Sequence, residues 1–215
     1  RSAIYASLNW KHEDIPLFLR AKNWTDQLRE LKASDFNFPA PLDMTNISVN
    51  YDDDSLRGGL EDNQIFLDNC RQAMMTGEPG FSFNFGDKQN ETLRNACTEV
   101  TSSDDSDVCN LGSVNLSRIG SIAELASVVE LATLFLLCGT LRAELPYEKI
   151  GRVREKNRRL GLGLMGIHEW LIQRGLSYRV HPELHKWLSV YKGVSDEISR
   201  KYADLFSISR PVANR

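Results

Sequence analysis

The stretch Asn95-Ala96-Cys97-Thr98-Glu99 carries an amide, a thiol and a carboxylate at alternate positions, and Cys109 follows a short distance further along the chain. Alternate side chains of an extended segment project to the same side, so we expect the three groups to face one pocket. A turn in the acidic linker 101–107 would bring Cys109 back beside Cys97. The thiol could then carry a radical or a charge, the carboxylate could take a proton, the amide could orient a hydroxyl, and the second thiol could give electrons.

A strand end with an incidental thiol is the alternative interpretation of the same residues. A hydrolytic thiol needs a histidine partner. Histidine is absent between His12 and His168, which disfavours a cysteine protease. A redox role for two thiols needs no histidine, so the pattern favours redox or radical chemistry.

The composition is that of an ordinary globular protein. The chain has 215 residues, of which 41% are hydrophobic and 26% charged, enough for one or two domains. A net charge of -3 gives no general attraction to nucleic acid or to an anionic membrane. We therefore expect no nucleic-acid or membrane partner, and the small number of cysteines favours a cytoplasmic protein. Because the chain begins with Arg and ends without a natural-looking tail, we expect a piece of a longer protein.

Four cysteines are too few for a disulfide scaffold. Cys70 and Cys138 lie in apolar segments with helical spacing, and we expect both to be buried core thiols. His181 and His185 are four residues apart but lack a third ligand nearby, which disfavours a structural zinc site.

Local patterns predict alternating strands and helices. Alternation and composition predict strands at 2–10, 46–51, 81–84 and 114–116. Helical spacing predicts helices that open near Asp14 and Thr25, and longer ones at 61–75, 121–141, 167–173 and 182–205. Such alternation predicts an α/β fold with mostly parallel strand pairing.

The segment 121–141 is the most apolar run. Glu124 and Glu130 interrupt it, which predicts a buried helix rather than a membrane span. Ser121 and Glu124 have the spacing of a capping box at its start.

Gly161 to Gly166 spells GxGxxG. A dinucleotide fingerprint requires a buried strand before the glycines, whereas the preceding segment 152–159 is highly charged. We therefore expect these glycines to allow close packing of a helix.

Several of these motifs resemble the catalytic subunit of ribonucleotide reductase, most closely its adenosylcobalamin-dependent class II form. The stretch at 95–99 resembles the NxCxE active-site motif, and Cys109 to Leu116 resembles the second redox-cysteine segment. The short gap between the two cysteines favours class II over class I. The other similar stretches are 1–15, Asn46-Ile47-Ser48-Val49, Thr76-Gly77-Glu78-Pro79-Gly80 and Arg159 to Gly166.

The resemblance implies a role for each site residue. Cys97 would be the thiyl radical that removes the ribose 3′ hydrogen, and Glu99 would accept the 3′-hydroxyl proton. Asn95 would bind the ribose hydroxyls, and Ser48 would also contact the substrate. Cys109 would be one of two thiols that reduce the 2′ position and end as a disulfide, with its partner upstream of this chain.

The resemblance also implies the surroundings of the site. Residues 1–215 would be one fragment of a ten-stranded α/β barrel, incomplete at both ends, with Cys97 on a central finger loop. The segment 38–45 would correspond, loosely, to the specificity loop. Adenosylcobalamin would be the cofactor. The partners would be a ribonucleotide substrate, a nucleotide effector, a thioredoxin-type reductant and a second copy of the parent.

The family's phosphate-binding loop and C-terminal thiols would lie outside this chain, so we do not expect the fragment alone to turn over. Two alternatives remain open. The chain could come from a class I large subunit that needs a metal-radical partner protein, or from a non-catalytic α/β module.

Overall fold

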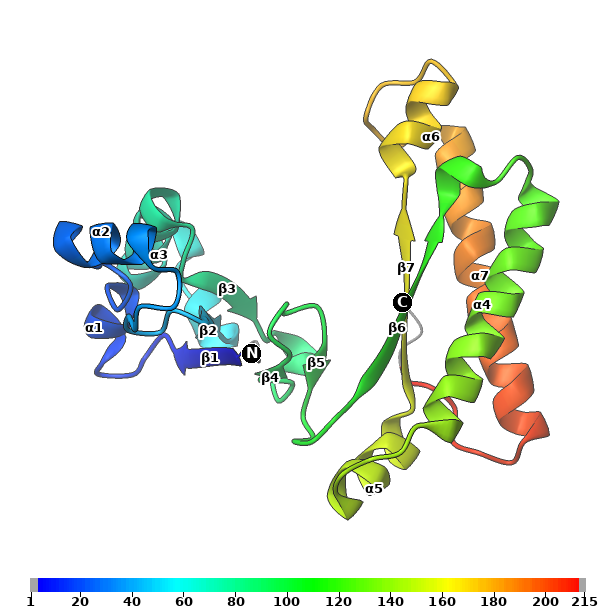
Figure 1. Ribbon diagram of the computed structural model, residues 1–215, viewed down its shortest axis with the longest axis horizontal. Helices are drawn as coiled ribbons and strands as arrows, with labels where there is room; N and C mark the ends of the chain where they lie inside the picture. Colours follow the sequence, from blue (N-terminus) through cyan, green and yellow to red (C-terminus); the bar gives the residue numbers. More distant parts are fainter. Residues whose placement is uncertain (1–3, 213–215) are drawn as a thin grey trace. The chain divides into compact units, whose positions relative to one another are not determined.

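The computed structural model describes residues 4–212 and divides the chain into two compact units, up to Asp105 and from Ser106 (Figure 1). In the first unit, β1 (Ile4–Asn9), β2 (Thr45–Tyr51) and β3 (Gly80–Phe83) form a parallel sheet in that order. Parallel neighbours need crossover connections. These contain α1 (Ile15–Leu19) and α2 (Asp26–Ser34) before β2, and α3 (Gln64–Thr76) before β3.

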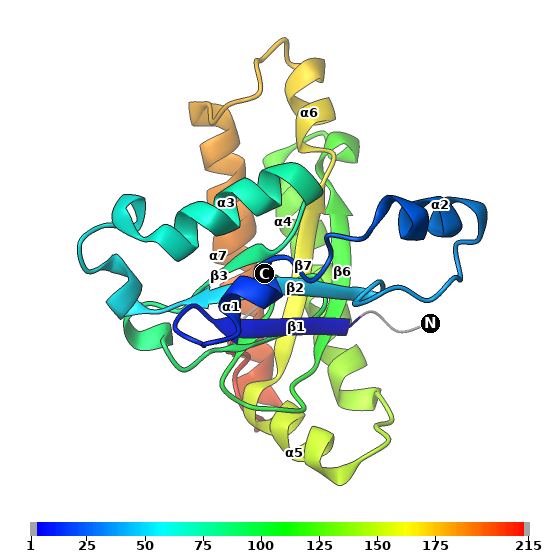
Figure 2. The ribbon, with the colours of Figure 1, turned by 90° about the vertical axis from the view of Figure 1, so that its left-hand side faces the viewer.

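The sheet has one apolar and one polar face, because side chains alternate along each strand. Val49 and Tyr51 of β2 are buried against Ile15 and Leu19 of α1, with Phe66 of α3 packed on the same cluster. Figure 2 shows α1 and α3 next to the strands of this sheet. The strand register places polar residues together on the opposite face, which we call the polar face. It comprises Tyr5, Ser7, Asn9, Asn46, Ser48, Asn50 and Ser82.

A short antiparallel hairpin follows the sheet. Its strands are β4 (Leu93–Arg94) and β5 (Thr101–Ser102). The segment that connects them contains Asn95, Cys97 and Glu99.

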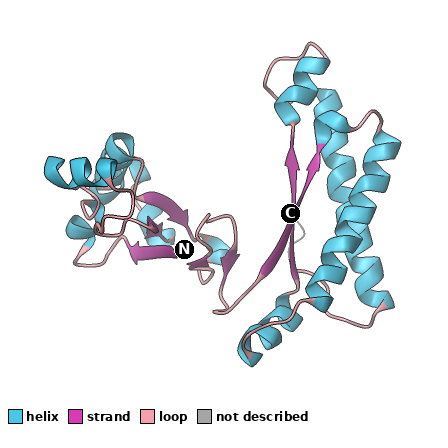
Figure 3. Ribbon diagram, viewed as in Figure 1, coloured by secondary structure: helices cyan, strands magenta, loops and turns pink. Residues whose placement is uncertain are grey.

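The second unit is built on a parallel pair, β6 (Cys109–Asn115) and β7 (Arg159–Met165). The crossover between them contains α4 (Ile122–Arg142) and α5 (Glu148–Asn157), and α6 (Ile167–Gln173) and α7 (Pro182–Leu205) follow. Helices α4 and α7 lie side by side along the pair (Figure 3). The core between these elements includes Leu125, Val129, Leu137, Leu160, Leu162 and Trp187.

Helix α4 is buried on one face only. Ser121 Oγ accepts a hydrogen bond from Glu124 N (3.2 Å), while the Glu124 carboxylate accepts from Gly120 N, one residue earlier than in a standard capping box. By length and composition α4 could cross a membrane, a property that core helices of soluble proteins share. Leu131, Phe135 and Cys138 are exposed, so the prediction that Cys138 is buried is wrong, and Cys70 is only partly buried.

The glycine-rich segment at 159–165 is the strand β7, so the helix expected to contain these glycines is wrong. Leu160 and Leu162 alternate with glycines, and this period of two buries the leucines on one face. A Cβ added to Gly161 would lie 2.3 Å from Leu111 Cδ2 of the neighbouring strand. The motif is itself the strand rather than the turn after one, which removes the context of a dinucleotide site.

A largely buried ion pair fixes the start of the β6–β7 pair. Asp107 Oδ2 accepts hydrogen bonds from Arg159 Nε (2.6 Å) and Asn157 Nδ2 (2.8 Å). The Asp107 and Arg159 side chains are only 5% and 13% exposed.

Gly166→Ala should destabilise the second unit by about 2 kcal/mol, because Gly166 has a φ of 72° and an added Cβ would lie 2.1 Å from Asn115 Oδ1. The matched control is Gly193→Ala in α7, where an added Cβ has no neighbour within 4 Å. That change should stabilise the unit by about 1 kcal/mol. Urea unfolding of both variants measures the difference, and equal effects would contradict the strand-to-helix turn at Gly166.

Asp107→Asn should destabilise the β6–β7 pair by about 3 kcal/mol, because it leaves the buried Arg159 guanidinium without its charge partner. Glu148→Gln is the control, since its ion pair with Arg152 is solvent-exposed and its loss should change stability by less than about 1 kcal/mol. Hydrogen exchange of the β6 and β7 amides reads out both changes. Unaltered protection in Asp107→Asn would show that the pair does not hold the strands together.

Candidate active site on the β4–β5 hairpin

Residues 95–100 form a tight turn rather than the extended segment expected from the sequence. Thr98 N donates to Asn95 O (3.0 Å), and Thr98 has a φ of 69°, in the left-handed region that non-glycine residues rarely adopt. The turn is required because six residues must reverse the chain between two paired antiparallel strands. The expectation that Asn95, Cys97 and Glu99 alternate along one extended strand is therefore wrong.

The turn still brings the predicted amide and carboxylate together. Asn95 Nδ2 donates to Glu99 Oε1 (2.6 Å), and Asn95 Oδ1 accepts from Val100 N (3.1 Å). A hydrogen bond to a carboxylate is stronger than one between neutral groups, so Asn95 orients Glu99. Cys97 lies between them in sequence and is an exposed thiol. The arrangement offers an exposed sulfur and, on the same turn, a carboxylate that can accept a proton.

Two side chains that the sequence analysis did not single out join this hairpin to the sheet. Arg94 Nε donates to Ser82 Oγ (2.5 Å), and Arg94 Nη2 donates to Asn84 Oδ1 (2.9 Å). Asn46 Nδ2 donates to the carbonyl oxygen of Ala96. Because Asn46 and Ser82 belong to the polar face, these contacts hold the hairpin against that face. Asn46 lies in the family-like stretch at 46–49, and this resemblance was the feature of the sequence that could have pointed to it.

Ser48, the remaining substrate-contact prediction, is buried on the polar face between Asn46 and Asn50. Its partner in the register is Gly80, where an added Cβ would lie 2.9 Å from Ser48 Oγ. Within the part of the chain that the structure describes, Tyr5 Oη and Asn50 Oδ1 are buried without a hydrogen-bond partner. A buried polar atom without a partner costs about 1–3 kcal/mol, so both atoms could gain by binding a polar ligand.

Cys109 begins β6 in the second unit, on the strand face that points away from α4. Gly112 faces α4, since a Cβ added there would lie 3.3 Å from Leu136 of that helix. Cys109 is three positions earlier on the same strand, so its side chain points to the opposite face. Gly161 leaves space beside the thiol, since a Cβ there would lie 3.2 Å from Cys109 Sγ. Cys97 belongs to the first unit, and the approach of the two thiols stays a prediction.

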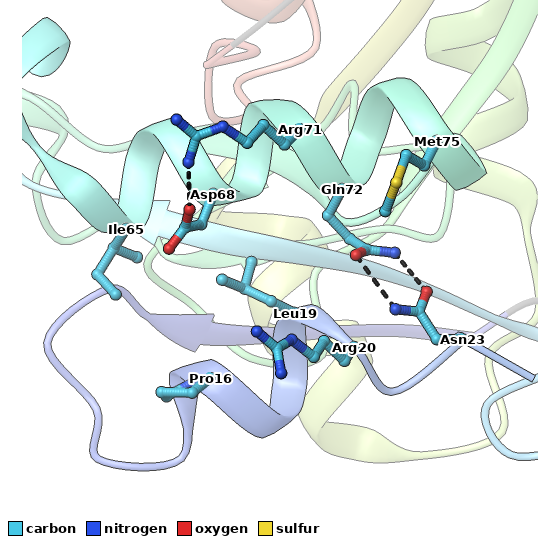
Figure 4. Close-up of a pocket in the computed structure, with 9 residues that line it drawn as sticks. All are labelled: Pro16, Leu19, Arg20, Asn23, Ile65, Asp68, Arg71, Gln72 and Met75. Atoms are coloured by element: carbon cyan, nitrogen blue, oxygen red, sulfur yellow. Dashed lines mark hydrogen bonds and ion pairs between the residues drawn. The ribbon is translucent and has the colours of Figure 1, made fainter.

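A hollow of about 270 Å³ lies elsewhere in the first unit, between α1 and α3 (Figure 4). Asn23 and Gln72 exchange hydrogen bonds at one end, and Arg71 pairs with Asp68 (2.7 Å) at the other. These helices cover the apolar face of the sheet, whereas the hairpin lies on the polar face. The hollow is therefore separate from the residues expected to carry chemistry.

The described residues do not form a metal site, because no group of three or more His, Cys, Asp or Glu side chains among them could hold an ion. Three hollows of about 270, 340 and 440 Å³ lie within residues 4–212, and none of the three is lined by Cys97 or Cys109. None of these three would therefore place a corrin ring beside the candidate thiol.

Comparisons with known proteins identify the family. Residues 63–186, more than half of the chain, match the ribonucleotide reductase barrel domain. The chain is 25% identical to a putative adenosylcobalamin-dependent ribonucleoside-triphosphate reductase of Mycobacterium phage D29, over all of this chain and 32% of that protein. It is 32% identical to the ribonucleoside-diphosphate reductase large subunit of Bovine herpesvirus 1.1, over 49% of this chain and 16% of that protein.

The fold is also similar to a solved structure, the class Id ribonucleotide reductase alpha subunit of Actinobacillus ureae. The TM-score is 0.71 at 19% identity, over 94% of this chain and 41% of that one. The chain thus spans less than half the length of the relatives it matches. The α/β prediction is confirmed, although the described strands form three separate sheets and do not close a barrel. The chain belongs to the ribonucleotide reductase barrel-domain family.

Proposed function

We propose that this chain carries the radical thiol of a ribonucleotide reductase whose full-length form converts ribonucleotides to 2′-deoxyribonucleotides for DNA synthesis. The observation that carries the proposal is the turn at 95–100. In it the Asn95 amide donates to the Glu99 carboxylate, and the exposed thiol of Cys97 lies between these two residues in sequence. Family membership makes this turn a candidate for the NxCxE active site rather than an incidental strand end.

Cys97 and Glu99 perform the first half of the proposed reaction. A thiyl radical on Cys97 takes the hydrogen atom from the ribose 3′ carbon and becomes a thiol. Glu99 accepts the 3′-hydroxyl proton, and the adjacent 2′ hydroxyl leaves as water after it takes one proton from the thiol pair that includes Cys109. Asn95 orients Glu99 and binds the ribose hydroxyls.

Cys109 performs the second half together with a thiol outside this chain. The two thiols supply two electrons and two protons and become a disulfide, and Cys97 returns its hydrogen atom to the 3′ carbon. The balance is one ribonucleotide and two thiols giving one deoxyribonucleotide, one water and one disulfide. A thioredoxin-type reductant then restores the thiols.

The polar face would hold the substrate. Ser48 lies on it between Asn46 and Asn50, and the buried atoms Tyr5 Oη and Asn50 Oδ1 have no described partner. A ribose hydroxyl can donate to Asn50 Oδ1 or accept from Tyr5 Oη, whereas phosphate oxygens can only accept. This supports Ser48 as a substrate contact beside Asn95 and Glu99.

Adenosylcobalamin is the proposed source of the radical. The support is the match over the whole chain to the cobalamin-dependent phage relative, whereas the herpesvirus large subunit matches only half of it. The three hollows described above are not lined by Cys97, so we assign none of their residues to the corrin. A class I large subunit with a metal-radical partner is the second candidate, favoured by the higher identity of the herpesvirus relative.

The remaining features of the proposal concern the whole protein. Residues 1–215 would belong to one barrel domain, although two compact units are found within them. A nucleotide effector, a second copy of the parent and a cytoplasmic location complete the proposal.

Deoxyribonucleotide formation by the full-length protein tests this function, with a dithiol reductant and with or without adenosylcobalamin. Cys97→Ser should abolish turnover, because a hydroxyl does not form the required radical. Glu99→Gln should lower kcat by about 10²–10⁴-fold through loss of the proton acceptor. Cys138→Ser is the matched control, since that exposed thiol of α4 has no proposed role and its loss should leave turnover unchanged.

Turnover that appears only with a metal-loaded partner protein would keep the reaction and replace class II by class I. A folded, nucleotide-binding protein that fails to turn over under either condition would overturn the enzymatic proposal in favour of the non-catalytic module.

A further inference from the structure

We propose that Asn46 is a positioning residue for Cys97, and that it acts by holding the carbonyl oxygen of Ala96. The expected effect on catalysis rests on the proposed function, whereas the effect on the position of Cys97 does not. Asn46 lies on β2, 50 positions before Ala96, and its side-chain amide donates to that carbonyl.

The position of the bond gives it a direct effect on the thiol. The carbonyl of Ala96 and the amide nitrogen of Cys97 belong to the same planar peptide unit. Holding the oxygen therefore fixes the plane that leads into Cys97, leaving the Cys97 φ and side-chain torsions to place the sulfur. The bonds of Asn95 to Glu99 and Val100 are internal to the turn, whereas Asn46 reaches it from the sheet.

Asn46 can hold the turn because its own backbone is fixed on both sides. Lys22 Nζ donates to Thr45 O (2.6 Å), and Ile47 N donates to Glu78 Oε1 (3.3 Å). Lys22 and Glu78 also form an ion pair whose side chains are only 16% and 24% exposed.

These contacts replace strand pairing that is missing at this end of β2. The register with β3 begins only at Ser48, opposite Gly80, while on the other side Asn46 pairs with Tyr5 of β1. The side chains of Lys22 and Glu78 therefore bind the carbonyl oxygen of Thr45 and the amide nitrogen of Ile47, which lie before the first position of β2 that pairs with β3. The result is a rigid base from which Asn46 extends to the hairpin.

The catalytic consequence follows from the geometry that hydrogen transfer requires. A displacement of about 1 Å at a reacting atom can lower a rate by roughly 100-fold. Removal of the Asn46 amide should let the Ala96–Cys97 peptide rotate and spread the positions of the sulfur. We expect kcat to fall about tenfold to 100-fold while KM changes little.

The test compares Asn46→Ala and the isosteric Asn46→Asp, which lacks the amide donor, in the full-length protein. The first readout is the rate at which iodoacetamide alkylates Cys97, measured by mass spectrometry with Cys138 as the internal reference. Both variants should change the Cys97 rate at least about threefold, because the sulfur samples new environments. The second readout is the division of the effect between kcat and KM.

Asn23→Ala is the matched control, because it also removes an exposed asparagine amide, in this case one bonded to Gln72 on the opposite side of the sheet. It should alter neither the alkylation rate nor kcat. Asn46→Gln, which keeps an amide donor, should recover part of the lost kcat.

The outcomes separate the inference from the proposed function. Changed alkylation of Cys97 in a protein that never reduces ribonucleotides would support the positioning role and overturn the function. Unchanged alkylation and unchanged kcat in folded Asn46→Asp would overturn the positioning role. If Asn46→Ala does not fold, Asn46→Asp alone decides, because it keeps the size of the side chain.

Discussion

The two-faced sheet β1–β2–β3 is the constraint on which the candidate site depends. Burial of Val49 and Tyr51 against α1 and α3 decides which side of β2 faces the core. Because strand side chains alternate, the same burial sends Asn46 and Ser48 to the other side. A slip of one residue would exchange the two faces. Apolar packing therefore also determines which polar groups meet the hairpin that carries Cys97.

The second unit follows the same rule with different residues. Leu160 and Leu162 are buried in the core that α4 and α7 share with β7. Alternation then leaves Cys109 and Gly161 on the opposite face, where the absence of a side chain at Gly161 gives the thiol space. In both units the cysteine with a proposed role lies outside the apolar core, on or beside a strand face that packing has already specified.

The sequence predicted the long helices α3, α4, α6 and α7 and the strands β1, β2 and β3. The strand expected at 114–116 overlaps only the end of β6, and the two-residue strands β4 and β5 were not predicted. The strand at 159–165 was missed because its alternating glycines give little hydrophobic signal and a charged helix precedes it. Cys138 was predicted to be buried because an almost wholly apolar run does not reveal which face of a helix is covered.

The candidate site was predicted in its residue types but not in its shape. The pattern at 95–99 is compatible with an extended strand, and only the pairing of β4 with β5 forces the turn. The contact of Asn46 with Ala96 joins residues 50 positions apart, and Arg94 reaches Ser82 of another strand. Local sequence patterns carry no information on such tertiary hydrogen bonds. The predicted closeness of the Asn95 and Glu99 side chains is correct because both residues lie within a single turn.

The most direct test is a crystal structure of the full-length protein with a bound ribonucleotide. The predicted result is Cys97 Sγ at about 3.5 Å from the ribose 3′ carbon, with a Glu99 oxygen at about 3 Å from the 3′ hydroxyl. Asn46 should still hold the Ala96 carbonyl in that complex. A ribonucleotide bound away from the polar face, or a Cys97 sulfur directed away from the ribose, would contradict the assignment of this hairpin as the catalytic element.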